Sequence, residues 1–170
     1  MGTAQHVPKA LLCLAQASTK EEAQAAYWRI DNTVIVQGYL YESALPTVVC
    51  AVTLLDRCSS FGRPWLLELL VQIGGGEPNR TELELSSDLR QRCLQEIKKG
   101  FAVYLSLLEC GDLSEVGLCV DLVGLCVQQD SAIKEQVRWY LERTLQRVDL
   151  HQGVKALVTN WLQDESLLME

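Results

Sequence analysis

The stretch Ala25-Ala-Tyr-Trp-Arg-Ile-Asp-Asn-Thr-Val-Ile-Val-Gln-Gly-Tyr-Leu-Tyr-Glu-Ser-Ala-Leu-Pro46 organises this chain. It concentrates aromatic, charged and amide side chains within a run that is otherwise apolar. The segments that follow it carry regular amphipathic patterns, which are typical of a scaffold. We therefore expect any function of the chain to involve this stretch.

Within this stretch, residues 33–41 are compatible with either a strand or a helix. β-Branched and aromatic residues dominate there, and Val34 and Val36 alternate as they would in a strand. As a helix, the segment would be capped by Asp31 or Asn32. Because both neighbouring segments predict helices and a lone strand would have no partner, we predict a helix.

Amphipathic periodicity predicts helices along the rest of the chain. The expected ranges are 7–17, 20–30, 46–57, 64–73, 89–108, 113–127, 133–148 and 150–162. Gly100 falls inside the fifth range, where we expect it to permit close approach of a neighbouring backbone. Residues 74–87 form the longest break, which is typical of a functional or mobile loop.

These helices predict an all-α fold in a single domain that spans residues 1–170. Antiparallel helix pairs recur at about forty residues, which is the period of armadillo and HEAT repeats. We predict a right-handed α-solenoid of HEAT-like helix pairs. The alternative is an irregular helical bundle, because the repeat is not exact.

Composition narrows the range of functions. A formal net charge of −7 is unfavourable for binding a phosphate backbone and favours a basic protein partner. We predict no membrane span, because no apolar run approaches the roughly eighteen residues that a span needs. Seven Cys, an odd number, predict reduced thiols in a cytoplasmic protein.

Catalytic, cofactor and metal sites are not predicted. The two histidines, His6 and His151, lie near a chain end and a helix start, away from any cysteine in the helical patterns. Helix capping and solvation account for the three carboxylate pairs, Glu21/Glu22, Glu82/Glu84 and Glu165/Glu170. Gly74-Gly-Gly76 leads into an acidic loop, which is the wrong context for a phosphate.

Two stretches of the chain combine aromatic, charged and apolar residues in a distinctive order: Tyr27-Trp28-Arg29-Ile30-Asp31-Asn32 through Pro46, and Trp65-Leu-Leu-Glu68-Leu-Leu. In these stretches the chain resembles a group of small bacterial HEAT-like proteins. This resemblance covers residues 22–73, and beyond them it is only compositional. The resemblance implies an α-solenoid that binds other proteins, and such modules occur among the immunity proteins encoded beside secreted bacterial toxins.

We accordingly predict an immunity protein that occludes the active site of a cognate toxin with a basic surface. Aromatic residues would supply most of the affinity, and carboxylates would speed the encounter. The predicted partner-binding residues are Trp28, Arg29, Asp31, Asn32, Gln37, Tyr39, Tyr41, Glu42, Trp65 and Glu68.

Four alternatives remain open. The aromatic residues could instead pack the core while Arg29 pairs with Asp31 or Glu42. The chain could be a helical scaffold or adaptor of another pathway. It could also be a metal-dependent enzyme that uses carboxylates. The fourth alternative is a helical-repeat protein that binds nucleic acid, which the net charge disfavours.

Overall fold

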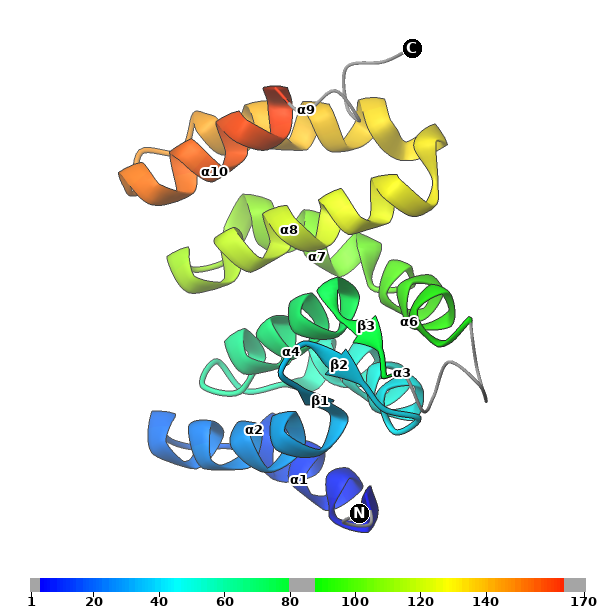
Figure 1. The fold of residues 1–170 in the computed structure, drawn as a ribbon. Coiled ribbons are helices and arrows are strands. Elements are labelled where there is room, and N and C mark those ends of the chain that lie inside the picture. Colours follow the sequence, from blue (N-terminus) through cyan, green and yellow to red (C-terminus); the bar gives the residue numbers. More distant parts are fainter. Residues whose placement is uncertain (1–3, 80–87, 164–170) are drawn as a thin grey trace. The chain divides into compact units, whose positions relative to one another are not determined.

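A computed structural model describes residues 4–79 and 88–163 of the chain (Figure 1). These residues are predominantly helical, as predicted. They group into two compact units, Met1–Gly100 (unit 1) and Phe101–Glu170 (unit 2). No helix in the described ranges is both long and apolar enough to cross a membrane.

Unit 1 contains five α-helices, two short 3-10 helices and three strands of two residues each, within its described part. The helices are α1 (Val7–Ala15), α2 (Lys20–Val34), α3 (Ala44–Leu54), α4 (Arg63–Gly75) and α6 (Leu89–Lys98), with 3-10 turns η1 (Ala4–His6) and η2 (Leu55–Arg57). The strands are β1 (Ile35–Val36), β2 (Tyr39–Leu40) and β3 (Glu77–Pro78).

Local sequence signals account for the helix starts in unit 1. The Thr19 hydroxyl accepts the Glu22 N–H at 3.2 Å, while the Glu22 carboxylate accepts the Ser18 N–H at 2.8 Å. This arrangement satisfies N–H groups that would otherwise be unpaired at the start of α2. A proline in the first turn starts both α1 and α4.

The predicted helix at residues 33–41 is wrong. Helix α2 continues to Val34, so Asp31 and Asn32 lie inside it, and the chain then forms a hairpin of β1 and β2. The two-residue turn of Gln37 (φ 53°) and Gly38 (φ 80°) has positive φ at both positions, the geometry that suits tight hairpins.

A strand partner for this hairpin comes from an unexpected segment. The strand β3 follows α4 and pairs in parallel with β2, which extends the hairpin to three strands (Figure 1). Glu77 donates its N–H to the Gly38 carbonyl at 2.9 Å, and Asn79 donates to Leu40 at 3.0 Å. The predicted loop at residues 74–87 therefore contains a strand, while residues 80–87 lie outside the described ranges.

The helices of unit 1 pack through small and aliphatic residues. α1 packs against α2 and α3, α2 packs against α4, and α6 packs against α3 and α4. Gly62 lies against the Leu14 carbonyl, where a Cβ would collide, and Ser59 donates its N–H to the Ala15 carbonyl at 2.8 Å. The start of α4 is thereby fixed to the end of α1.

Unit 2 contains four α-helices and one 3-10 turn in its described part. They are α7 (Phe101–Cys110), α8 (Leu113–Gln129), η3 (Ser131–Ile133), α9 (Lys134–Leu145) and α10 (Gln152–Gln163). The predicted single helix at 89–108 is wrong, because α6 ends at Lys98 and α7 begins at Phe101. Gly100 lies in that break and not inside a helix.

Polar contacts fix the helix ends of unit 2. Asp112 and Glu115 form a capping box at the start of α8, in which Glu115 is buried and accepts the Asp112 N–H at 2.9 Å. The Arg147 guanidinium donates to the carbonyls of Leu108 (3.0 Å) and Gly111 (2.8 Å), at the end of α7. One arginine thus satisfies carbonyl groups that a helix C-terminus leaves unpaired.

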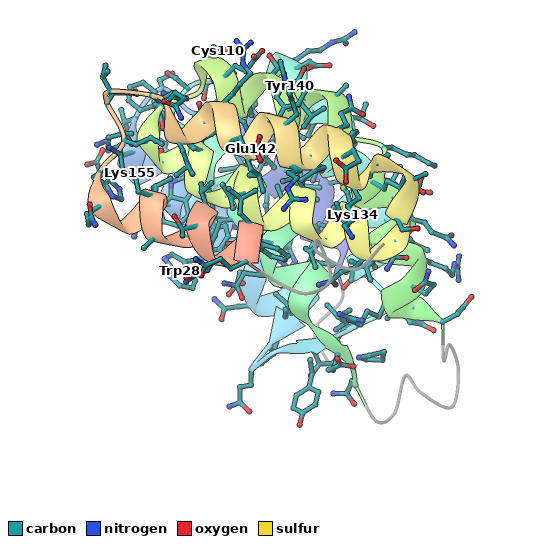
Figure 2. All side chains as sticks on the ribbon, turned by 90° about the horizontal axis from the view of Figure 1, so that it is seen from above. Trp28, Cys110, Lys134, Tyr140, Glu142 and Lys155 are labelled. Atoms are coloured by element: carbon teal, nitrogen blue, oxygen red, sulfur yellow. The ribbon has the colours of Figure 1, made fainter. Side chains whose placement is uncertain are left out.

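Packing within unit 2 joins α7 to α8 and α9, and α10 to α8 and α9. The Trp161 ring of α10 lies on Gly124 of α8, and its indole N–H donates to Asp121 at 3.1 Å. Solvent-facing side chains of α9 include Glu142, whose carboxylate pairs with Arg138 at 3.7 Å (Figure 2).

Candidate partner-binding site

Four of the predicted partner-binding residues come together around Tyr27, where α2 packs against α4. Tyr27, Trp28, Asp31, Trp65 and Glu68 make up this group, hereafter the Tyr27 cluster. The Tyr27 ring lies edge-on to Trp28, with centroids 5.2 Å apart. The same ring also contacts Trp65, with centroids 4.8 Å apart and planes at 40°.

Helical spacing explains this grouping. On α2, Asp31 follows Trp28 by three positions and Tyr27 by four, so all three project from neighbouring turns. On α4, Glu68 follows Trp65 by three positions. The packing of α2 on α4 therefore brings two carboxylates beside three aromatic rings.

Burial and charge raise the pKa values in the cluster. The buried Tyr27 hydroxyl donates to Asp31 Oδ1 at 3.3 Å. Its pKa is raised, first by burial and then by the charges of Asp31 and Glu68. Burial also raises the pKa of Asp31, against the lowering effect of the hydrogen bond from Tyr27, and the Glu68 charge adds to the increase.

No positive charge neutralises these carboxylates within the described residues. The expected alternative, an ion pair of Arg29 with Asp31 or Glu42, does not occur there. Glu68 instead accepts a hydrogen bond from Gln72 at 2.8 Å, which brings no charge. The Tyr27 cluster therefore combines a net negative charge with aromatic surface.

The cluster is open to a partner at Trp28. Trp28, which is labelled in Figure 2, is 49% exposed, whereas Tyr27 is 4% exposed and therefore forms the buried part of the cluster. Asp31, Trp65 and Glu68 are half-buried. Half-buried carboxylates keep contact with solvent but are screened less than fully exposed ones.

The other six predicted residues lie elsewhere on unit 1. Asn32 is exposed on α2 and donates to the Trp28 carbonyl at 2.8 Å. Arg29 is also exposed, and its carbonyl accepts a hydrogen bond from His6 at 2.9 Å. The remaining four belong to the hairpin and the segment after it: Gln37, Tyr39, Tyr41 and Glu42.

Sequence reasoning missed two features of this unit. Tyr27 was quoted but not assigned to the site, although its four-residue spacing from Asp31 signals their contact. The second feature is an apolar groove of about 320 Å³ between α1 and α3. It is lined by Pro8, Leu11, Leu12, Val49, Cys50, Thr53 and Leu54. The signal for it is that α3 contains no charged residue, although Val49 and Cys50 are exposed.

Both histidines make contacts with nearby backbone or side-chain groups. His6 bridges the Arg29 carbonyl and the Thr33 hydroxyl, and His151 lies 3.4 Å from the Val154 N–H. Within residues 4–79 and 88–163, no three His, Cys, Asp or Glu residues are placed to hold one metal ion. The predicted pairs Glu82/Glu84 and Glu165/Glu170 lie outside the described residues.

Comparisons of the chain with protein-family models, with curated proteins and with solved structures each find no match.

Proposed function

We propose that this chain works by binding a protein, and that the Tyr27 cluster is the centre of the binding surface. The observation that supports this proposal most directly is the half-exposed Trp28 beside two carboxylates that have no cation within the described residues. Tryptophan and tyrosine dominate the energetics of protein interfaces. Uncompensated carboxylates add attraction to a basic partner and fix its register.

The proposed scaffold is a HEAT-like solenoid. Its support is the order of packing inside each unit: α1 contacts α3 and α2 contacts α4, while α7 contacts α9 and α8 contacts α10. First helices thus contact first helices and second helices contact second helices, with further contacts of α1 with α4 and of α8 with α9, as in stacked helix pairs. In this proposal residues 1–170 form one repeat domain.

The proposed partner is a bacterial toxin domain with a basic surface, and the chain acts in the cytoplasm as its immunity protein. The acidic balance of the chain supports this choice, since 22 Asp and Glu stand against 15 Lys and Arg. Occlusion of the toxin's active site requires affinity and correct placement but no chemistry from the inhibitor.

Co-expression with the product of the neighbouring gene tests this proposal. We expect the wild-type chain to restore growth and Trp28→Ala to lose most of that rescue. Trp139→Ala is a matched control, because Trp139 is also 49% exposed and lies edge-on to its neighbour Tyr140, in unit 2. Equal rescue by the two variants would place binding away from the Tyr27 cluster.

The association rate of the purified pair provides a second test. Between about 50 and 500 mM salt, we expect the association rate to fall at least tenfold, because salt screens the attraction between exposed charges. A rate that does not change with salt would contradict electrostatic attraction to a basic partner.

A further inference from the structure

We propose that the Tyr27 cluster is a receptor for a single arginine side chain of the partner. This inference rests on the proposed protein-binding function and specifies the chemistry recognised at its centre. Three aromatic rings and two carboxylates meet at the α2–α4 contact, and Trp28 exposes half of its surface. A cation fits such a combination because aromatic faces and carboxylates both attract positive charge.

The aromatic part of the receptor is held in place before binding. Trp65 and Trp28 each contact the Tyr27 ring, on separate elements and at different angles. Tyr27 is itself buried and donates its hydroxyl hydrogen bond to Asp31. Little side-chain freedom is therefore lost when a partner residue contacts these rings.

The carboxylates of Asp31 and Glu68 give the receptor a negative charge, and no cation of the described residues pairs with it. Asp31 uses one oxygen for a 3.3 Å hydrogen bond from Tyr27, and Glu68 uses one for Gln72. A carboxylate has about four acceptor positions, so both groups retain capacity for further donors. Arg29, the nearest cation along α2, forms no ion pair with Asp31 in the described structure.

Arginine fits this site better than lysine. Its planar guanidinium can stack on an indole ring while its N–H groups donate to two acceptors at once. The ammonium group of lysine is a compact, strongly hydrated charge, and it loses more hydration when it enters a half-buried site. The arrangement of flat rings beside two separate carboxylates matches the planar, multiply donating group.

A titration with N-acetyl-arginine amide tests this assignment on the full-length chain. Two-dimensional NMR would follow the indole N–H signals of Trp28 and Trp65, with Trp139 and Trp161 as internal controls. We expect the first pair to shift with saturation and the second pair to stay unchanged. The lysine amide should bind at least threefold more weakly, and the neutral citrulline amide at least tenfold more weakly.

Substitutions then locate the site. Asp31→Asn and Glu68→Gln should each weaken binding of the arginine amide at least threefold, while Trp139→Ala should leave it unchanged. Circular dichroism would confirm that each variant is folded. Equal binding of citrulline or lysine amide, or wild-type affinity in both carboxylate variants, would overturn the proposal.

The experiments distinguish failure of the arginine receptor from failure of the protein-binding proposal. If the chain binds arginine amide but rescues no cell from the toxin, the immunity function fails and the receptor stands. If Trp28 is needed for rescue but the arginine amide does not bind, the receptor fails and the protein-binding function stands.

Discussion

Asp31 illustrates the cost of keeping an uncompensated carboxylate in the Tyr27 cluster. Burial raises its pKa above the ordinary value of 3.8. A group whose pKa is raised on folding contributes its full stability below its unfolded pKa and loses it as the pH rises through the folded pKa. At neutral pH the ionised Asp31 therefore lowers the free energy of unfolding, as is common for residues kept for binding.

Asp31→Asn should consequently raise the free energy of unfolding at pH 7, because it removes a partly buried charge while keeping a polar group beside Tyr27. The gain should shrink towards pH 3.5, where Asp31 is largely protonated. Urea unfolding at both pH values measures this difference. Glu42→Gln, an exposed carboxylate in the same stretch, serves as the control. A loss of stability at pH 7 would show that the Tyr27 hydrogen bond outweighs the cost of burial.

Arg147, in contrast to Asp31, carries a charge that stabilises the fold. Its side chain is only 16% exposed and holds the carbonyls at the end of α7. Hydrogen bonds to a charged group contribute roughly 1.5–3 kcal/mol, so Arg147→Met should lower the free energy of unfolding by about 2 kcal/mol.

Arg143→Met provides the comparison for this change. Arg143 pairs with Glu109 at 3.1 Å and lies over the Trp139 ring, but it is more exposed than Arg147. Its removal should cost about 1 kcal/mol or less. Chemical denaturation of both variants measures the difference, and equal losses would contradict the role of Arg147 at the end of α7.

Among the secondary-structure elements, the hairpin after α2 was not predicted from the sequence. Most helices lie near their predicted ranges, because apolar spacing and capping residues are local signals. The pairing of β2 with β3 joins residues that are 38 positions apart, as in Tyr39 and Glu77, and no local pattern encodes it. The Gln37-Gly38 pair was nevertheless a local signal, since a residue followed by glycine between β-formers is typical of a two-residue turn.

The candidate site, like the fold, could be predicted from the sequence only where the signals were local. Trp28, Asp31, Trp65 and Glu68 could be selected by residue type, and helical spacing places them in two pairs. Their convergence on Tyr27 depends on how α2 packs against α4, which is a tertiary contact. Gln37, Tyr39, Tyr41 and Glu42 were grouped with them by proximity in sequence, but they belong to the hairpin and the segment after it, and not to α2 or α4.

Gly38→Ala tests the backbone of this turn. Nothing lies within 4 Å of a Cβ built at Gly38, so its φ of 80° is the only source of strain. We expect a loss of about 1 kcal/mol in the free energy of unfolding.

Gly75→Ala is the matched control for the turn, because a Cβ there also meets nothing within 4 Å and φ is not positive. Gly75 ends α4, so alanine should be neutral or slightly stabilising. Thermal denaturation would compare the two variants. If both substitutions changed the stability by similar amounts, the positive φ of Gly38 would not be the cause of its loss.

For the whole molecule, the tryptophans provide a test of the predicted single domain. Trp28 and Trp65 belong to unit 1, whereas Trp139 and Trp161 belong to unit 2. A single domain predicts that both pairs report the same urea midpoint. The four indole N–H signals, followed by two-dimensional NMR during urea unfolding, report each unit separately without replacing any tryptophan.

Gly124→Ala sharpens this test, because a Cβ there would collide with the Trp161 ring in unit 2. Overpacking of this kind costs roughly 1–3 kcal/mol. In one cooperative domain the substitution should lower the midpoint reported by Trp28 and Trp65 as well. Gly117→Ala on the same helix has room for a methyl group, 3.8 Å from Val154, and should not lower it. A shift confined to the unit 2 signal would contradict the single domain.

The tight turn at Gln37-Gly38 also has a practical consequence. Its tip is exposed, and the strand that follows it, β2, is paired with β1 on one side and β3 on the other. Exposed turn tips accept inserted sequence more readily than other positions. A fluorophore attached there would sit on the same unit as Trp28 without replacing any residue of the Tyr27 cluster, and a change in its emission would be the optical readout of a protein docking on this unit.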